Sequence, residues 1–121
     1  MKRFAHGCCI LLATCLLTGT ADAHATLAKA IPAVGSTLGE APAQVILEFT
    51  ERIEPALSTI QVNNASGTQV SAGRATLIPG RDDTLAVALP PILPGTYKVT
   101  WKVVSEDTHV TRGSFTFTVL P

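Results

Sequence analysis

The chain has 121 residues, and its nine Lys and Arg are balanced by nine Asp and Glu, so the formal net charge is zero. A chain with no excess of basic residues lacks the electrostatic footprint of a protein that binds nucleic acid or an acidic membrane surface. We therefore expect neither kind of partner. The length predicts one domain with a single core and no deep internal cavity.

The N-terminal residues have the pattern of a secretory signal peptide. A short basic start precedes an apolar run over residues 10–17, which is too short to span a membrane. Residues 21–23 read Ala-Asp-Ala, the small-x-small pattern of a cleavage site. The sequence therefore predicts a cleaved signal peptide over residues 1–23 and one exported mature domain over residues 24–121.

Two alternatives stay open for this leader: an uncleaved anchor helix, and a lipoprotein cut before Cys15. Cleavage after Ala23 would remove all three cysteines (Cys8, Cys9 and Cys15) and Met1, the one methionine. The mature domain would then offer a metal no sulfur ligand and could form no disulfide. After cleavage we expect no stable association with the membrane.

Short β-rich runs, separated by turn-forming Gly, Pro, Asn and Asp, follow one another along the mature domain. No long segment has helical periodicity. The predicted strands cover residues 25–31, 44–50, 57–62, 68–71, 74–78, 85–89, 96–104 and 114–120. The pattern predicts an all-β fold, an antiparallel β-sandwich of about seven strands.

Alternation of apolar and polar residues predicts which side chains form the core. The side chains expected on core faces are Val45, Leu47 and Phe49 in one strand and Phe115, Phe117 and Val119 in the last strand. Trp101, in the strand over residues 96–104, is expected to pack between the two sheets.

A carboxylate and an imidazole lie two residues apart after the strand over 96–104, at Asp107 and His109. If the backbone stays extended there, side chains at i and i+2 point to the same side, so both can face one ion. Glu106 should then point to the opposite side. After cleavage the only other histidine is His24, which would be the first residue.

A free N-terminal histidine offers two nitrogen donors, its α-amine and an imidazole nitrogen, which can chelate one metal ion. His24, His109 and Asp107 together supply three nitrogens and one oxygen. Such a set favours Cu(II), with Ni(II) next, while Zn(II) on two histidines and an aspartate stays chemically possible. Glu51 is a candidate acceptor that orients a ligating imidazole. The alternatives are a solvated turn at Glu51 and a solvated, metal-free loop around the Asp-x-His pair.

Several stretches of the chain form a specific set of motifs. They comprise the opening over residues 24–27 and 30–36, the segments 45–51, 93–97 and 99–109, and the ending Gly113 with 115–119. Together they resemble the CopC family of periplasmic copper-resistance proteins, whose pattern includes H-A-x-L near the start, S-x-D-G-H, and a final F-x-F-x-V strand. The resemblance spans nearly the whole mature chain.

The resemblance implies an immunoglobulin-like β-sandwich, or Greek-key β-barrel, that binds one Cu(II) per chain. It implies a histidine brace whose ligands are the amine and imidazole of His24, Asp107 and the imidazole of His109. The implied role is that of a copper chaperone in copper homeostasis or resistance: copper storage, buffering or delivery, without enzymatic activity. The implied partner is a CopD-like inner-membrane copper transporter or another cuproprotein.

Two departures from the family pattern stand out. Thr108 occupies the position where the family usually has glycine. Residues 57–90 contain no methionine, so the Met-rich Cu(I) segment of some members is absent. The second departure favours a member that binds only Cu(II).

Two other functions stay open. A histidine brace also resembles the copper site of lytic polysaccharide monooxygenases, which would make the chain an oxidative enzyme. A carboxylate beside the brace favours Cu(II) over Cu(I), and the short domain leaves little room for an extended substrate surface; both features count against that hypothesis. The third hypothesis is a metal-free β-sandwich that acts as an interaction module.

Overall fold

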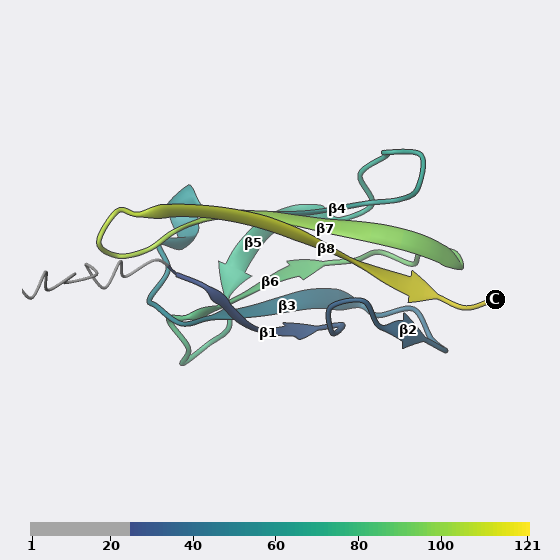
Figure 1. Ribbon diagram of the computed structural model, residues 1–121, viewed down its shortest axis with the longest axis horizontal. Coiled ribbons are helices and arrows are strands. Elements are labelled where there is room, and N and C mark those ends of the chain that lie inside the picture. Colours follow the sequence, from purple (N-terminus) through teal and green to yellow (C-terminus); the bar gives the residue numbers. More distant parts are fainter. Residues whose placement is uncertain (1–24) are drawn as a thin grey trace, which may run out of the picture.

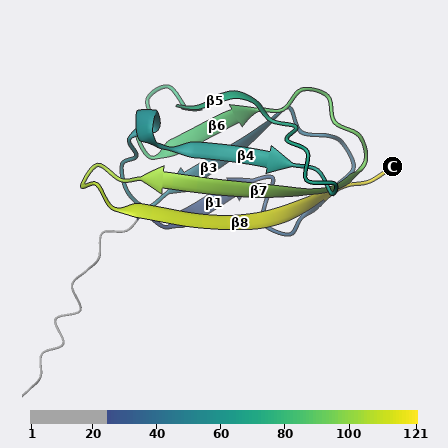
Figure 2. The same cartoon turned by 90° about the horizontal axis from the view of Figure 1, so that it is seen from above.

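The computed structural model describes residues 25–121; the expected signal peptide and His24 lie outside the described residues. The described chain folds into two four-stranded β-sheets that pack face to face (Figure 1). Seen from above, strands of one sheet lie across those of the other, and the long β7–β8 pair forms one flank (Figure 2). The predicted all-β sandwich is confirmed.

Eight strands and one short 3₁₀ helix make up the described fold. One sheet has the order β1-β3-β6-β5 and the other β2-β8-β7-β4. The bounds are β1 Leu27–Ile31, β2 Thr37–Leu38, β3 Gln44–Phe49, η1 Pro55–Leu57, β4 Thr59–Asn63, β5 Ala72–Leu77, β6 Thr84–Ala88, β7 Gly95–Val104 and β8 Val110–Val119. The chain crosses between the sheets several times, as in Greek-key sandwiches.

The strands match the predicted ones, within one or two residues at their ends, with four differences. The predicted strand over residues 68–71 does not form, and Gln69 there makes only an isolated bridge with Asn63. The short strand β2 was not predicted, and it pairs in parallel with β8, so the sandwich is not purely antiparallel. Leu57 belongs to η1 and not to a strand. Strand β8 begins at Val110, four residues earlier than predicted, because residues 110–113 pair with β7 as regularly as the residues that follow them.

The core lies between the two sheets and consists of the side chains predicted from alternation. Val45 and Leu47 have no exposed surface, and Phe49 is 1% exposed. On the facing sheet, Phe117 is 1% exposed and Phe115 is also buried. Burial of these apolar side chains is the main stabilising term of the fold.

Two aromatic residues of β7 adjoin this core in different ways. Tyr97 is buried, stacks on Phe117 at a centroid distance of 5.5 Å, and donates its hydroxyl hydrogen to the Leu93 carbonyl. Such a bond to the backbone just upstream is typical of the tyrosine corner of Greek-key sandwiches. Trp101 points to the core side as predicted but is only half-buried, in edge contact with Phe49 at 6.3 Å. Among residues 25–121, no helix has the length and apolarity needed to cross a membrane.

Candidate metal site

The turn between β7 and β8 carries the two predicted ligands of the described chain, at one end of the sandwich (Figure 1). The Thr108 amide donates to the Ser105 carbonyl at 2.8 Å, and the Ser105 amide donates to the His109 carbonyl at 2.9 Å. These two bonds close a three-residue hairpin loop, which places its last residue in the left-handed region. Thr108 has φ of +71° there.

The backbone of this loop therefore differs from the expectation. An extended chain was predicted to place Asp107 and His109 on one side, but residues 106–108 form a turn. The two side chains still meet: Nδ1 of His109 lies 3.0 Å from Oδ2 of Asp107. They meet because the turn brings the carboxylate back over the start of β8, and not because of strand periodicity.

The contact fixes which ring nitrogen of His109 carries a hydrogen when the ring is neutral. An ionised carboxylate can only accept hydrogen bonds, so Nδ1 is the donor and Nε2 is unprotonated. The side chains of His109 and Asp107 are 49% and 45% exposed. Solvent and solutes can therefore reach the pair.

Asp107 is held in its ionised form by its neighbours. The hydroxyl of Ser105 donates to Oδ1, and this bond, followed by that from His109, lowers the pKa of the Asp107 carboxyl below its usual value of 3.8. A hydrogen bond to the charged form has this effect because it is lost on protonation. The carboxylate is thus available as an anionic ligand at neutral pH.

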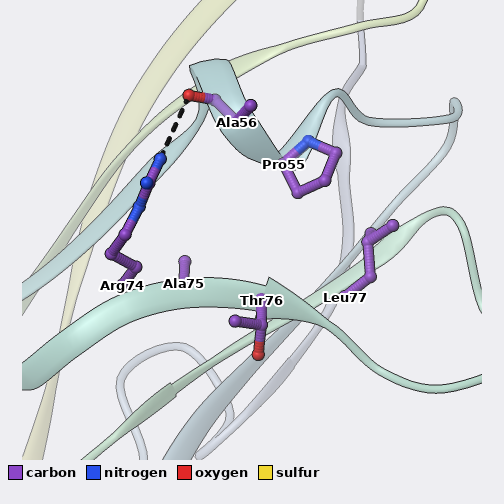
Figure 3. A pocket seen from close by; sticks show the side chains of 6 residues that line it. All are labelled: Pro55, Ala56, Arg74, Ala75, Thr76 and Leu77. Atoms are coloured by element: carbon purple, nitrogen blue, oxygen red, sulfur yellow. Dashed lines mark hydrogen bonds between the residues drawn. The ribbon is translucent and has the colours of Figure 1, made fainter.

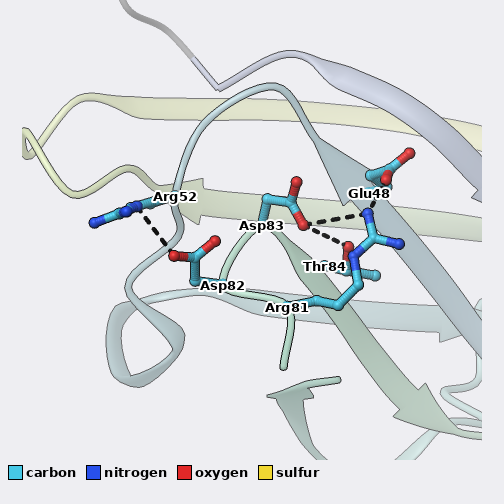
Figure 4. Close-up of polar contacts among 6 residues, drawn as sticks. All are labelled: Glu48, Arg52, Arg81, Asp82, Asp83 and Thr84. Carbon is cyan, nitrogen blue, oxygen red and sulfur yellow. Dashed lines mark hydrogen bonds and ion pairs between the residues drawn. The ribbon is translucent and has the colours of Figure 1, made fainter. Parts of the chain in front are cut away.

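The segment after β3 supports the turn from one side. Ile53 forms an isolated bridge with Ser105, and the Glu106 amide donates to the Arg52 carbonyl at 2.9 Å. The Arg52 guanidinium also lies 3.0 Å from Asp82 and 3.7 Å from Glu106 (Figure 4 shows the contact with Asp82). The β5–β6 loop, the segment after β3 and the β7–β8 turn are therefore linked at this end.

Figure 4 also shows a second arginine, Arg81, in the β5–β6 loop. Arg81 contacts Glu48 and Asp83, and its hydrogen bond with Glu48 raises the pKa of its guanidinium (Figure 4). These groups belong to the outer face of β3 and the β5–β6 loop, and they form an ion-pair cluster without a histidine.

A shallow depression beside the turn is lined by Glu51, Arg52, Glu106 and Asp107. Glu51 therefore lies near Asp107, while its candidate role, to orient a ligating imidazole, stays a prediction. Glu106 was expected on the opposite side of the chain from Asp107, and that prediction is wrong. Because the backbone turns here, Glu106 faces the same depression and pairs with Arg52.

The start of the described chain is anchored next to the turn. Ala25 is 2% exposed, and its carbonyl accepts a hydrogen bond of 2.8 Å from the Thr111 hydroxyl. The Thr26 amide donates to the Thr50 hydroxyl, and the Thr50 amide donates to the Thr26 carbonyl, both at 2.9 Å. Ala25 is thus fixed beside a residue of β8 that follows His109 by two positions.

The predicted ligands are brought together only in part by the described chain. Asp107 and His109 are in contact, and Glu51 borders the same depression as Asp107. His24 lies outside the described residues. Within residues 25–121, no group of three or more His, Cys, Asp and Glu side chains is arranged to hold a metal ion.

Sequence reasoning overlooked Ser105 and Thr111. Ser105 was visible only as the serine two residues before Asp107, and Thr111 as one of several threonines in a strand. A hydroxyl that bonds a carboxylate or a distant carbonyl leaves no periodic signal in the sequence.

Another hollow lies between η1 and β5. Figure 3 shows that only one of its side chains is charged, and Arg74 donates to the Ala56 carbonyl at 3.4 Å. The lining residues are Pro55, Ala56, Arg74, Ala75, Thr76 and Leu77. This set offers no carboxylate or imidazole to a metal, so the β7–β8 turn is the stronger candidate.

Comparison with known proteins identifies the class to which this fold and site belong. Residues 27–120 match the family model described as the CopC domain. The chain is 38% identical to copper resistance protein C of Pseudomonas syringae pv. tomato over 110 residues, covering 86% of each chain. The structure of CopC from Methylosinus trichosporium OB3b superposes with a TM-score of 0.76 at 31% identity, covering 81% of this chain and 95% of that one.

The chain belongs to the CopC family, as the resemblance of its motifs predicted. The family is one of copper-binding and copper-resistance proteins and not of enzymes. The chain is also 33% identical to the copper transport protein CutJ of Bacillus subtilis (strain 168) over 120 residues. That match covers 98% of this chain but only 22% of CutJ. A copper-related function follows from the family.

Proposed function

We propose that the mature chain binds one Cu(II) ion through the amine and imidazole of His24, the carboxylate of Asp107 and the imidazole of His109. The observation that carries the proposal is the 3.0 Å separation of Nδ1 of His109 and Oδ2 of Asp107. Two atoms that each lie about 2 Å from one ion, at tetragonal or tetrahedral angles, are about 2.8 to 3.3 Å apart. The two side chains are thus spaced as adjacent ligands, once the hydrogen on Nδ1 of His109 has moved to Nε2 so that Nδ1 can bind the ion.

The position of Ala25 supports the participation of His24. Consecutive Cα atoms are about 3.8 Å apart, so the residue before Ala25 starts from a point fixed by Thr111. Thr111 follows His109 by two residues along the chain. Cleavage of the signal peptide before His24 would create the free amine at this same end of the sandwich.

The donor atoms favour Cu(II) over the other metals considered. Three nitrogens and one oxygen without sulfur suit tetragonal Cu(II), and Cu(II) stands above Ni(II) and Zn(II) in the affinity order. The one methionine of the chain is Met1, and all three cysteines precede residue 16, so a mature chain from His24 would lack the soft ligands that Cu(I) prefers. Glu51, which borders the depression, would orient a ligating imidazole.

We further propose that the bound ion is cargo. The chain would buffer or store copper in the periplasm and deliver it to a CopD-like inner-membrane protein or another cuproprotein. The half-exposed ligand pair supports exchange, because an acceptor can approach the ion without unfolding the sandwich.

The test uses protein exported and processed in cells, with the mature N-terminus confirmed by intact mass. Cu(II) is titrated against a competing chelator while the EPR spectrum and stoichiometry are recorded. The comparison set is wild type, a version with one extra residue before His24, His109→Ala, Asp107→Ala and Asp82→Ala. Asp82 is the matched control, because it is an exposed aspartate at the same end whose partner is Arg52.

We expect one tetragonal Cu(II) per chain. The extra residue and His109→Ala should each weaken binding by more than the roughly 10- to 100-fold typical for groups that only orient ligands. Asp82→Ala, which removes an ion-pair partner of Arg52, should change it by no more than about a few-fold. Equal binding by the extended version would exclude the amine as a ligand. Absence of tight binding by the wild type would overturn the proposal.

A further inference from the structure

Ser105 is the most deeply buried residue of the site, at 2% exposed surface. It directly follows β7, and its backbone is held from two directions. Its amide donates to the His109 carbonyl, and its bridge with Ile53 ties it to the segment after β3. The side chain therefore starts from a fixed backbone position and has no exposure to open solvent.

The Ser105 hydroxyl has two acceptors within reach. One is Oδ1 of Asp107, and the other is the His109 carbonyl at 3.3 Å. A hydroxyl has one hydrogen to donate, and a charged oxygen is the stronger acceptor. Asp107 is also the nearer of the two acceptors, so it receives the hydrogen.

The two oxygens of the Asp107 carboxylate consequently have different surroundings. Oδ1 accepts the hydrogen of the buried Ser105 hydroxyl, whereas Oδ2 faces the half-exposed imidazole of His109 at 3.0 Å. Of the two oxygens, Oδ2 is the one that contacts the other candidate ligand, His109. The carboxylate is also kept from rotating, since rotation would break the bond to Oδ1.

We propose that Ser105 is a positioning residue of the copper site, whose hydroxyl holds Oδ1 so that Asp107 binds the ion through Oδ2 alone. This inference rests on the proposed Cu(II) site. A carboxylate that binds through one oxygen leaves the other positions around the ion to nitrogen ligands. Its orientation is also set before the ion arrives, which reduces the conformational entropy lost on binding.

The test compares Ser105→Ala, Ser105→Thr and a control serine at the far side of the fold. Ser71 is a suitable control, because it is also buried, at 8% exposed, and its Oγ accepts from the Val62 amide at 3.0 Å. Ser105→Ala should weaken Cu(II) binding by about 10-fold or more and change the copper hyperfine splitting in the EPR spectrum. Ser71→Ala should do neither, whatever it does to stability.

Ser105→Thr keeps the hydroxyl, so it should bind Cu(II) with the affinity and EPR spectrum of wild type. If only the small size of the Ser105 side chain mattered, Ser105→Ala would be tolerated better than Ser105→Thr. Thermal unfolding of the metal-free variants separates folding defects from binding defects. A crystal structure of the Cu(II)-loaded wild type gives a further test that needs no variant. It should place only Oδ2 at bonding distance, with Oγ of Ser105 on Oδ1.

The failures of the two proposals are distinguishable. If the wild type lacks a Cu(II) site, the proposed function fails. If the wild type binds Cu(II) but Ser105→Ala keeps its affinity and spectrum, or the loaded structure shows both carboxylate oxygens on the ion, only the role of Ser105 is wrong.

Discussion

The β7–β8 hairpin consists of a body and a turn that are held by different forces. In the body, pairing runs without interruption from Gly95 opposite Val119 to Val104 opposite Val110. Its core-facing side chains, such as Val99 and Val103, have no exposed surface. Burial of apolar surface fixes this part, because a shift by one residue would turn its apolar side outward.

The turn over residues 105–109 has no apolar side chain and is fixed by hydrogen bonds. Ser105 accounts for several of them, through its amide and its hydroxyl. Thr108 adopts a left-handed backbone that a β-branched residue disfavours. The candidate ligands thus lie at the point where hydrophobic stabilisation ends, so the turn can be varied without unfolding the sandwich.

The largest effect should come from the body, at Gly113. A Cβ added there would lie 2.6 Å from Cη2 and 2.8 Å from Cε2 of Trp101, which no relaxed structure permits. Gly113→Ala should therefore force the indole ring out of place and lower the free energy of unfolding by about 1–3 kcal/mol. Urea denaturation followed by Trp101 fluorescence measures the change.

Gly39→Ala is the control for Gly113→Ala. A Cβ at position 39 has no neighbour within 4 Å, so its effect should be close to zero. Equal stability of the two variants would mean that Trp101 does not pack over Gly113.

A smaller effect of opposite sign is expected in the turn, at Thr108. The left-handed conformation costs a residue with a Cβ about 1–2 kcal/mol, and replacement by glycine relieves this strain. Part of the relief is offset because glycine has greater conformational freedom in the unfolded chain. Thr108→Gly should therefore raise the free energy of unfolding by about 0.5–1 kcal/mol.

Thr68→Gly supplies the matched control for Thr108→Gly. Thr68 is an exposed loop threonine without a left-handed backbone, so its replacement should destabilise the fold. Stabilisation by both variants, or by neither, would contradict the assignment of strain to Thr108. Since Asp107 and His109 flank the substituted residue, the Cu(II) affinity of Thr108→Gly shows whether the strained backbone also serves the site.

A still smaller effect should depend on pH and involves Asp107. Its folded pKa is lowered, so the stabilisation it provides is present above the ordinary aspartate pKa of 3.8 and is lost as the pH falls through the lower folded value. Asp107→Asn should therefore be slightly less stable than wild type at neutral pH. The difference should shrink on acidification below that ordinary value, as measured by denaturation at several pH values without metal.

If the difference in the free energy of unfolding between wild type and Asp107→Asn grew towards acid pH, the pH dependence would be opposite to the expected one. That result would exclude a lowered pKa of Asp107.

The contrast between body and turn also explains what the sequence could predict. The core faces of β3 and β8 follow from alternation, because burial imposes period two on apolar residues. Asp107 and His109 were identified correctly as neighbours, but from an extended backbone that the turn does not have. The pairing of Glu106 with Arg52 and the anchoring of Ala25 by Thr111 join residues far apart in the sequence. Such polar contacts depend on the assembled fold and have no local signature.

The smallest effect is expected at Arg52, which links the turn to the β5–β6 loop. Its side chain is 67% exposed, and its partners Asp82 and Glu106 are 60% and 59% exposed. Exposed ion pairs contribute little because water and salt screen them, so Arg52→Gln should change the free energy of unfolding by no more than about 0.5 kcal/mol.

Cu(II) affinity is the sharper measurement for Arg52→Gln. Arg52 borders the same depression as Asp107, so removing its positive charge should strengthen binding of a cation by a few-fold at low salt, roughly the effect of a screened surface charge. Arg81→Gln is the control, because Arg81 pairs with Glu48 and Asp83 away from the turn. Weaker Cu(II) binding by Arg52→Gln, with Arg81→Gln unchanged, would show that the ion pairs of Arg52 hold the turn in its binding shape. The backbone bonds of Ser105 would then be insufficient by themselves.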